Sequence, residues 1–352
     1  MHVDVASALH HLDEFLERTA PGYADSAVLA DAARRISVDY TQTRQIDDDA
    51  AASVAYLAHF GPRAVVALAR ALRALPAPAV PRHVLDVGAG SGASALAWLA
   101  AGAKKVTLVE RSAKALALAT KLHAGRAVEM RPQSLFDTSA FGEVTHLSAA
   151  FVVGELTDDT DLPALFKKLA PNALHTVLVD AGDHPRARRL QHLRDALVLD
   201  AAVVVHGPCP HREPCPALLR ERDWCHDRVD KTLPPRLARF ARNVGRDDAA
   251  MSLSWLAFGQ GSGGTIAPGI VVIGEPRAEK GRVRVPVCGP GGLRFLQVLK
   301  RDKPAWRAAE DLQRGHRLPL PDGLSGDTMH VGNVEQLAIS ITDEVKAGGA
   351  SS

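Results

Sequence analysis

The segment Val84–Ala100, VLDVGAGSGASALAWLA, predicts the fold of the chain. An apolar run ends at Val87 and is followed by Gly88, Gly90 and Gly92, and then by an alanine- and leucine-rich stretch. Glycine permits a tight turn and lets a ligand approach the backbone closely. We therefore predict a buried strand, a glycine loop and a helix.

The first two predicted strands each carry a carboxylate. Asp86 lies in the first, and the second, KVTLVE, ends in Glu110. The G-x-G-x-G spacing lacks the third glycine position of the dinucleotide fingerprint, and a carboxylate at the tip of the second strand suits both hydroxyls of a ribose. The set is similar to the S-adenosylmethionine (SAM) site of class I methyltransferases, in which the acidic residue before the glycines lies near the methionine end of the cofactor. We expect SAM to be bound by Asp86, Gly88, Gly90, Gly92 and Glu110. A nucleotide-binding dehydrogenase and a fold that binds nothing remain alternatives.

Short apolar runs then alternate with helical stretches, which predicts an α/β fold with a parallel, doubly wound sheet. We expect four regions. The first, 1–75, is helical, with Gly61-Pro62 ending one helix and starting the next. The others are a Rossmann-like class I methyltransferase domain over 76–260, a small basic β-rich module over 261–330, and a partly disordered tail over 331–352. An antiparallel strand pair, DAAVVVHG and MSLSWLAFG, brackets a cysteine-rich insertion, 208–246.

Composition places the 352-residue chain among ordinary globular proteins, with 46% hydrophobic and 23% charged residues. No apolar run reaches the roughly 18 residues of a membrane span, and the N-terminus has neither the basic nor the apolar region of a signal peptide. We expect a cytoplasmic protein, without a membrane partner and monomeric when free.

No catalytic residue is predicted. Amino-methylating enzymes usually carry an Asn/Asp-Pro-Pro-aromatic turn after the fourth strand, where this chain reads AAFVVGELTD. None of the cysteines lies where carbon-5 methylation of RNA would need a nucleophile. Two roles are open for Glu155, namely a catalytic base and a glutamate that only begins a helix.

Three of the four cysteines lie within HGPCPHREPCPALLRERDWCH, residues 206–226. No pair has the two- to four-residue spacing of zinc sites, whereas iron–sulfur ligands are spaced more variably and are often followed by proline, as in Cys209-Pro210 and Cys215-Pro216. His206, His211 and His226 keep a mixed zinc site open, and free thiols are a third reading. The predicted metal ligands are Cys209, Cys215, Cys225 and Cys288.

Basic residues suggest a polyanionic partner. Residues 261–320 hold eleven Lys/Arg against five Asp/Glu, and arginines three apart in PPRLARFAR share one helical face, which suits phosphate contacts. Surface salt bridges and a core position for Trp306 are the alternatives. The predicted RNA-binding residues are Arg236, Arg239, Arg242, Lys300, Arg301 and Lys303.

Taken together, these motifs resemble the mitochondrial small-ribosomal-subunit assembly factors of the Rsm-twenty-two type, also called methyltransferase-like protein seventeen, and their bacterial homologues. The resemblance rests on AYLAHFGPRAVVALARAL, VLDVGAGSGASALAWL, FVVGEL, VLVDAGDHPRARRLQHLRDAL, CPHREPCPALLRERDWCH and VLKRDKPAWRAAEDLQRG. It implies a [4Fe–4S] cluster on the four cysteines and association with ribosomal RNA of the small subunit. Asp180 stands where relatives tend to have glutamate, and Asp183-His184 replaces a Gly-Thr type of turn.

The resemblance leaves methyl transfer open. It implies a SAM-binding, iron–sulfur, methyltransferase-like protein that binds small-subunit ribosomal RNA and assists assembly of that subunit. The alternatives are an active SAM-dependent rRNA methyltransferase and a zinc-stabilised small-molecule methyltransferase.

Overall fold

The structure is a computed structural model, and it describes residues 1–42, 50–76, 80–136, 141, 143–157, 159–245, 249–261, 269–320 and 328–337. Most of the predicted tail lies outside these residues. The chain forms two compact units, of which unit 1 is Met1–Val179 with Val229–Met251 and unit 2 is Asp180–Arg228 with Ser252–Ser352. Residues 1–75 belong to unit 1 together with the first strands, and residues 208–246 are divided between the two units.

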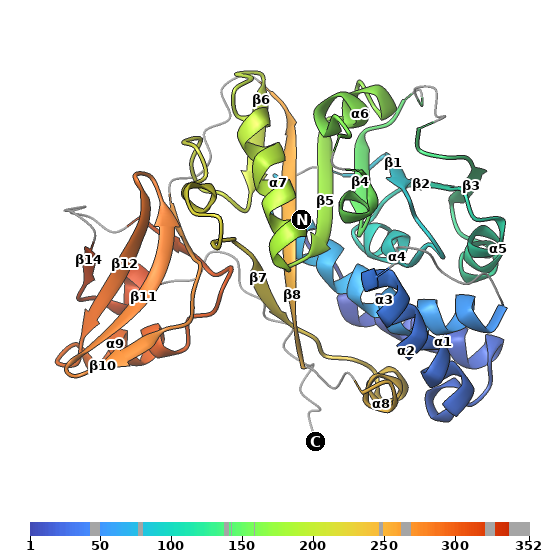
Figure 1. Cartoon of the computed structure of the whole chain (residues 1–352), viewed down its shortest axis with the longest axis horizontal. Helices are drawn as coiled ribbons and strands as arrows, with labels where there is room; N and C mark the ends of the chain where they lie inside the picture. The colour runs from blue at the N-terminus through green and yellow to red at the C-terminus, as the bar shows by residue number, and fades with distance from the viewer. Residues whose placement is uncertain are drawn as a thin grey trace. The chain divides into compact units, whose positions relative to one another are not determined.

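Unit 1 contains five parallel strands in the order β3-β2-β1-β4-β5 (Figure 1). The sheet order reverses between β1 and β4, and parallel α/β sheets bind ligands at the carboxyl ends of their strands at such a point. The predicted parallel α/β fold is confirmed. The strands are β1 (His83–Val87), β2 (Lys105–Glu110), β3 (Val128–Pro132), β4 (His146–Ala150) and β5 (His175–Ala181), and the helices between them are α4 (Ala93–Ala100), α5 (Ala113–Leu122) and α6 (Leu162–Leu169).

The remaining helices of unit 1 are α1 (Val5–Thr19), α2 (Ala27–Gln42), α3 (Ala50–Leu72) and α8 (Pro235–Asn243). Helix α3 packs against α1, α2 and α4, and it continues through Pro62, so the predicted break at Gly61-Pro62 is wrong. Buried Leu57 and Leu68 lie on either side of Pro62, and this packing offsets the lost backbone hydrogen bond.

Part of α3, Ala52–Leu72, is long and apolar enough to cross a membrane by length and composition. Most of this stretch, 67%, is buried, as in the core helix of a globular protein.

Unit 2 begins at Asp180 and contains α7 (His184–Leu197), β6 (Val203–Gly207) and the 3-10 turn η3 (Pro216–Leu219). The borders in the chain fall within β7 (Asp227–Asp230) and β8 (Ala250–Gln260), and residues 252–260 of β8 belong to unit 2. Strands β6 and β8 pair antiparallel, which confirms the predicted strand pair.

A second sheet in unit 2, drawn orange to red in Figure 1, has the order β13-β9-β11-β12-β14, with β10 beside β11. In β11, alternate residues Val283, Val285 and Val287 are fully buried in the core of this sheet. Because strand side chains alternate between faces, Cys288 lies on the other face. The strands are β9 (Gly269–Val272), β10 (Arg277–Glu279), β11 (Arg282–Gly289), β12 (Gly292–Leu299), β13 (Arg317–Pro319) and β14 (Thr328–Val331), and helix α9 (Lys303–Glu310) follows β12.

Candidate functional site

The glycine loop after β1 is held in a backbone conformation that only glycine adopts readily. Gly88, Gly90 and Gly92 have φ angles of 62°, 52° and 77°. A Cβ atom on Gly88 would lie 2.5 Å from Val152 Cγ2, whereas one on Gly90 would have only Tyr56 Cε1 as a neighbour, at 3.8 Å. The loop is therefore closed at Gly88 and open at Gly90, where a ligand can approach the backbone.

Glu110 ends β2 beside this loop. Its Oε2 accepts a hydrogen bond from the Gly90 amide at 3.0 Å, and its Oε1 accepts one from the Ser112 amide at 2.8 Å. A carboxylate has about four lone-pair sites, so this half-buried group can accept further bonds. Glu110 thus fixes the loop and keeps acceptor capacity for the hydroxyls of a ligand.

Asp86, which the sequence predicts to lie near the cofactor, is completely buried. One oxygen accepts from Ser148 Oγ at 2.6 Å and the other from Ser94 Oγ, while Ser148 Oγ accepts from Trp98 Nε1 at 2.8 Å. Burial raises the pKa of Asp86 to about 6, against the opposing effect of the two serine hydroxyls. Asp86 therefore anchors the strand beneath the loop through a hydrogen-bond network that sequence spacing did not reveal.

Two further residues beside the loop were not predicted. His123 Nε2 lies 2.9 Å from the Gly92 carbonyl oxygen, and burial lowers the pKa of His123 to about 4, so a neutral imidazole holds the loop. Tyr56, in α3, packs against Phe60 with ring centroids 4.9 Å apart and ring planes inclined by 36°. Tyr56 lies in the segment AYLAHFGPRAVVALARAL, but no sequence motif links this position to the glycines.

The segment after β4 carries the one non-glycine residue with positive φ among the described residues, Phe151 at 61°. Its amide donates to the Val179 carbonyl at 2.8 Å. A non-glycine residue in this conformation costs of order 1–3 kcal/mol and is enriched at functional sites. The next residue, Val152, is the one that closes the loop at Gly88. Glu155 ends a 3-10 turn, Val153–Glu155, and is exposed.

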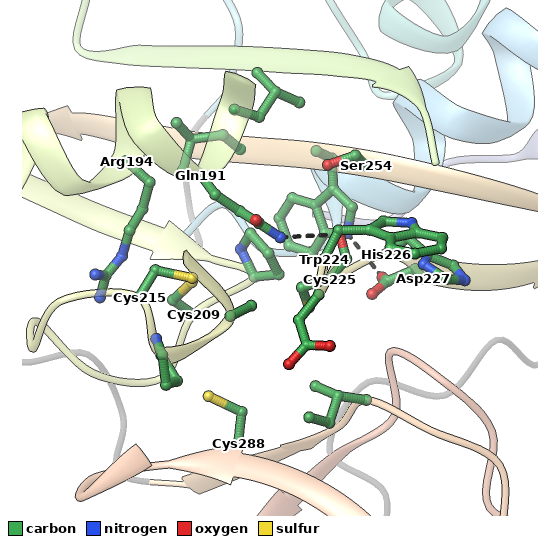
Figure 2. A pocket seen from close by; sticks show the side chains of 18 of the residues that line it. Gln191, Arg194, Cys209, Cys215, Trp224, Cys225, His226, Asp227, Ser254 and Cys288 are labelled. Atoms are coloured by element: carbon green, nitrogen blue, oxygen red, sulfur yellow. Dashed lines mark hydrogen bonds between the residues drawn. The ribbon is translucent and has the colours of Figure 1, made fainter. Parts of the chain in front are cut away.

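All four cysteines line one cavity of about 280 Å³ within unit 2 (Figure 2). Cys209 follows β6, Cys215 precedes η3, and Cys225 precedes β7. Cys288 faces the cavity from β11, opposite Cys209 and Cys215. The structure therefore gathers the four predicted ligands from two segments far apart in the chain.

The thiols do not converge on a single point. Among the described residues, no group of three or more His, Cys, Asp or Glu is placed to hold a metal ion. Burial raises the pKa of Cys209 to about 11 and that of Cys225 well above its usual value, and it also raises the pKa of Cys215 and Cys288. Without a ligand these are four neutral thiols. A bound metal group would deprotonate them, so the donor set fits such a group chemically.

Two of the three histidines considered as ligands line the same cavity, namely His211 and His226, and His206 does not. His211 Nε2 lies 3.4 Å from Cys288 Sγ. Burial lowers the pKa of His211, and that of His226 to about 4, so both rings are neutral.

The basic helix α7 holds the cysteine-bearing segment. Arg188 Nη1 donates to the carbonyl oxygens of Ala217, Arg220 and Asp223 at 3.3, 2.9 and 2.8 Å. Gln191 Nε2 donates to the Cys225 carbonyl at 3.3 Å. The Arg188 guanidinium and the Gln191 amide are therefore used within the protein.

Asp180 and Asp183 both lie beside Arg186. Asp183 caps α7, accepting from the Arg186 amide at 3.2 Å and from its Nη1 at 2.5 Å. Buried Asp180 lies 3.6 Å from Arg186 Nε. Both carboxylates thus stabilise the start of α7.

The predicted RNA-binding residues separate into two groups. Arg236 binds both oxygens of Asp13 at 3.0 and 3.1 Å, and Arg239 pairs with Asp25 at 3.0 Å. For these two arginines the salt-bridge alternative is the one that the structure supports. The exposed members of the set, for which no side-chain partner is seen among the described residues, are Arg242, Lys300, Arg301 and Lys303. Trp306 packs on the core of the second sheet.

Several solved structures are similar to part of this chain. The plantazolicin methyltransferase in complex with SAH is 12% identical with a TM-score of 0.38, over 70% of this chain and 99% of that one. The magnesium protoporphyrin IX methyltransferase of Synechocystis, with bound SAM, is 12% identical with a TM-score of 0.36, over 65% and 97%. The 16S rRNA methylase RmtB is 13% identical with a TM-score of 0.36, over 66% and 74%.

No curated protein shows significant sequence similarity. The family described as mitochondrial small ribosomal subunit Rsm22 matches residues 50–319, well over half of the chain. This confirms the resemblance found in the sequence, and the chain belongs to the Rsm22 family.

Proposed function

We propose that this protein is a SAM-binding, iron–sulfur, methyltransferase-like factor that binds small-subunit ribosomal RNA and assists assembly of that subunit. The observation that carries the proposal is the gathering of four thiols, one buried and three partly buried, around one cavity in a member of the Rsm22 family. The SAM site and the RNA surface rest on separate observations.

SAM binding is supported by the shape of the glycine loop. Gly90 leaves its open side free for a ligand, and Glu110 faces the same loop with acceptor capacity to spare. A bound SAM would supply a methyl group on a sulfonium. Gly90, Glu110 and Tyr56 would hold the cofactor, and Asp86 and His123 would keep the loop in shape from beneath.

The sequence around the cysteines supports a cluster rather than a single zinc ion. No two cysteines have the two- to four-residue spacing of zinc sites, and Cys209 and Cys215 are each followed by proline, as iron–sulfur ligands often are. Cys209, Cys215, Cys225 and Cys288 would be the ligands. The cluster would contribute its binding free energy to folding by tying β11 to the segment between β6 and β7.

The test is metal analysis of the whole protein purified without oxygen. We expect about four iron and four sulfide per chain, and loss of both in each single Cys→Ser variant. One zinc per chain without iron would reject the cluster and favour a zinc-stabilised enzyme. A protein that holds neither metal would leave the thiols without a structural ligand and would reject the metal site altogether.

Ribosomal RNA binding is supported by family membership and by the exposed cations Lys300, Arg301 and Lys303 around the start of α9. Charges of this kind contact phosphates and make affinity depend on salt. Binding to small-subunit ribosomal RNA, measured at several salt concentrations, tests this point. Salt-independent or absent binding would remove the RNA from the proposal.

An active rRNA methyltransferase is the second candidate, and the strained backbone at Phe151 favours it. A methyl mark on small-subunit RNA that disappears when Gly90 is replaced by valine would establish this activity. Normal subunit assembly by a variant that no longer binds SAM would instead show that methyl transfer is not needed for assembly.

A further inference from the structure

Arg194 of α7 is a buried cation beside the cysteine cavity. It is 1% exposed and lines the cavity together with all four cysteines. Figure 2 shows its side chain descending from α7 next to Cys215 and Cys209. Burying a charge is costly unless the charge is paired and hydrogen-bonded, so the partners of this guanidinium indicate its role.

Two of its nitrogen atoms hold the loop between the first two cysteines. Nη1 donates to the Glu213 carbonyl and to Asp195 Oδ1, the latter at 2.7 Å, and Nη2 donates to the His211 carbonyl. The neighbouring residue Asp195 accepts the Cys215 amide with both oxygens, at 3.1 and 2.9 Å. Arg194 thus holds the carbonyl groups of His211 and Glu213, which precede Cys215. Asp195 holds the amide of Cys215 itself.

The third nitrogen has no partner in the part of the chain that the structure describes. Arg194 Nε is fully buried and makes no hydrogen bond there. A buried donor without a partner is rare and destabilises the folded state. The charge is also incompletely matched, because the one carboxylate that pairs with it, that of Asp195, is 25% exposed and so is screened by water.

We propose that Arg194 is a positioning residue whose guanidinium provides positive charge and a hydrogen bond to the group that the four thiolates hold, and thereby raises the reduction potential of that group. The inference rests on the proposed cluster. One-electron reduction by an external reductant adds one negative charge to the cluster and breaks no bond. A buried cation stabilises the more negative state, and hydrogen bonds and local charge are among the factors that set cluster potentials.

The test is an anaerobic redox titration of the full-length protein with iron and sulfide assays on each sample. Arg194→Gln removes the charge, and we expect a lower midpoint potential than in the wild type. Asp195→Asn keeps an acceptor for the Cys215 amide but leaves the guanidinium charge uncompensated, and we expect a higher potential. Arg188→Gln is the matched control, because Arg188 also belongs to α7 and also holds the cysteine-bearing segment, but does not line the cavity. We expect it to keep the wild-type potential.

An iron-containing Arg194→Gln protein with the wild-type potential would overturn the inference. If Arg194→Gln loses its iron, the midpoint potential of Asp195→Asn becomes the test. An unchanged or lower midpoint potential in Asp195→Asn would then overturn the inference. An equal shift in Arg188→Gln would also overturn it, since the effect would then come from loosening of the segment. Failure of the cluster proposal itself looks different, because the wild-type protein would then contain no iron and sulfide to titrate.

Discussion

Gly88 and Val152 are in direct contact at the base of the glycine loop, and replacing Gly88 with alanine tests that contact. Alanine at φ 62° costs about 1–2 kcal/mol from the left-handed backbone alone. The new Cβ would also lie 2.5 Å from Val152 Cγ2, and such overpacking costs about 1–3 kcal/mol more. We therefore expect Gly88→Ala to lower the free energy of unfolding by about 2–5 kcal/mol.

A double-mutant cycle separates the two contributions. Val152→Ala removes the methyl group that the new Cβ would meet, so the double variant should be less destabilised than the sum of the single variants by about 1–3 kcal/mol. Gly102→Ala is the control, because Gly102 has φ 89° and nothing within 4 Å of a Cβ, and it should show the backbone cost alone. The measurement is urea unfolding followed by circular dichroism. Strict additivity in the cycle, or equal losses in Gly88→Ala and Gly102→Ala, would refute the packing of Val152 on the loop.

Three further outcomes are expected from other parts of the molecule. The pKa of Asp86 is raised from 3.8 to about 6, so the folded state holds more protons than the unfolded state between these values. Wild-type stability relative to Asp86→Asn should therefore fall by about 2 kcal/mol as pH rises from 4 to 6; parallel urea midpoints for the two proteins across this range would contradict it. Arg236→Ala should cost about 1–2 kcal/mol in unfolding free energy, since a buried carboxylate loses its cation, and should leave RNA affinity unchanged; a loss of RNA affinity at equal stability would contradict this. Replacing Lys300, Arg301 and Lys303 together by Gln should leave thermal stability unchanged and reduce the salt slope of RNA binding by about 2–3; an unchanged slope would show that these cations do not contact RNA.

The sequence predicted the features that depend on local chemistry. A glycine loop needs residues without Cβ at positive φ, and alternating apolar runs need a parallel sheet to bury them, so Gly88, Gly90, Gly92 and the strands around them could be recognised directly. The cysteines could be grouped because the chain has only four, so that Cys288 of the β-rich module was expected to complete the site.

The tertiary structure decided which side chains meet across long separations. The sequence could not show that Arg236 pairs with Asp13, which lies 223 positions earlier. A surface arginine that binds RNA and one that binds a protein carboxylate have the same helical spacing. It could not show that packing carries α3 through Pro62. Nor could it show that Asp86 is bonded to Ser148 or that Arg194 is buried at the cysteines. Local sequence fixes backbone conformation through steric rules within a few residues, but burial and pairing depend on which distant segments the whole fold brings together.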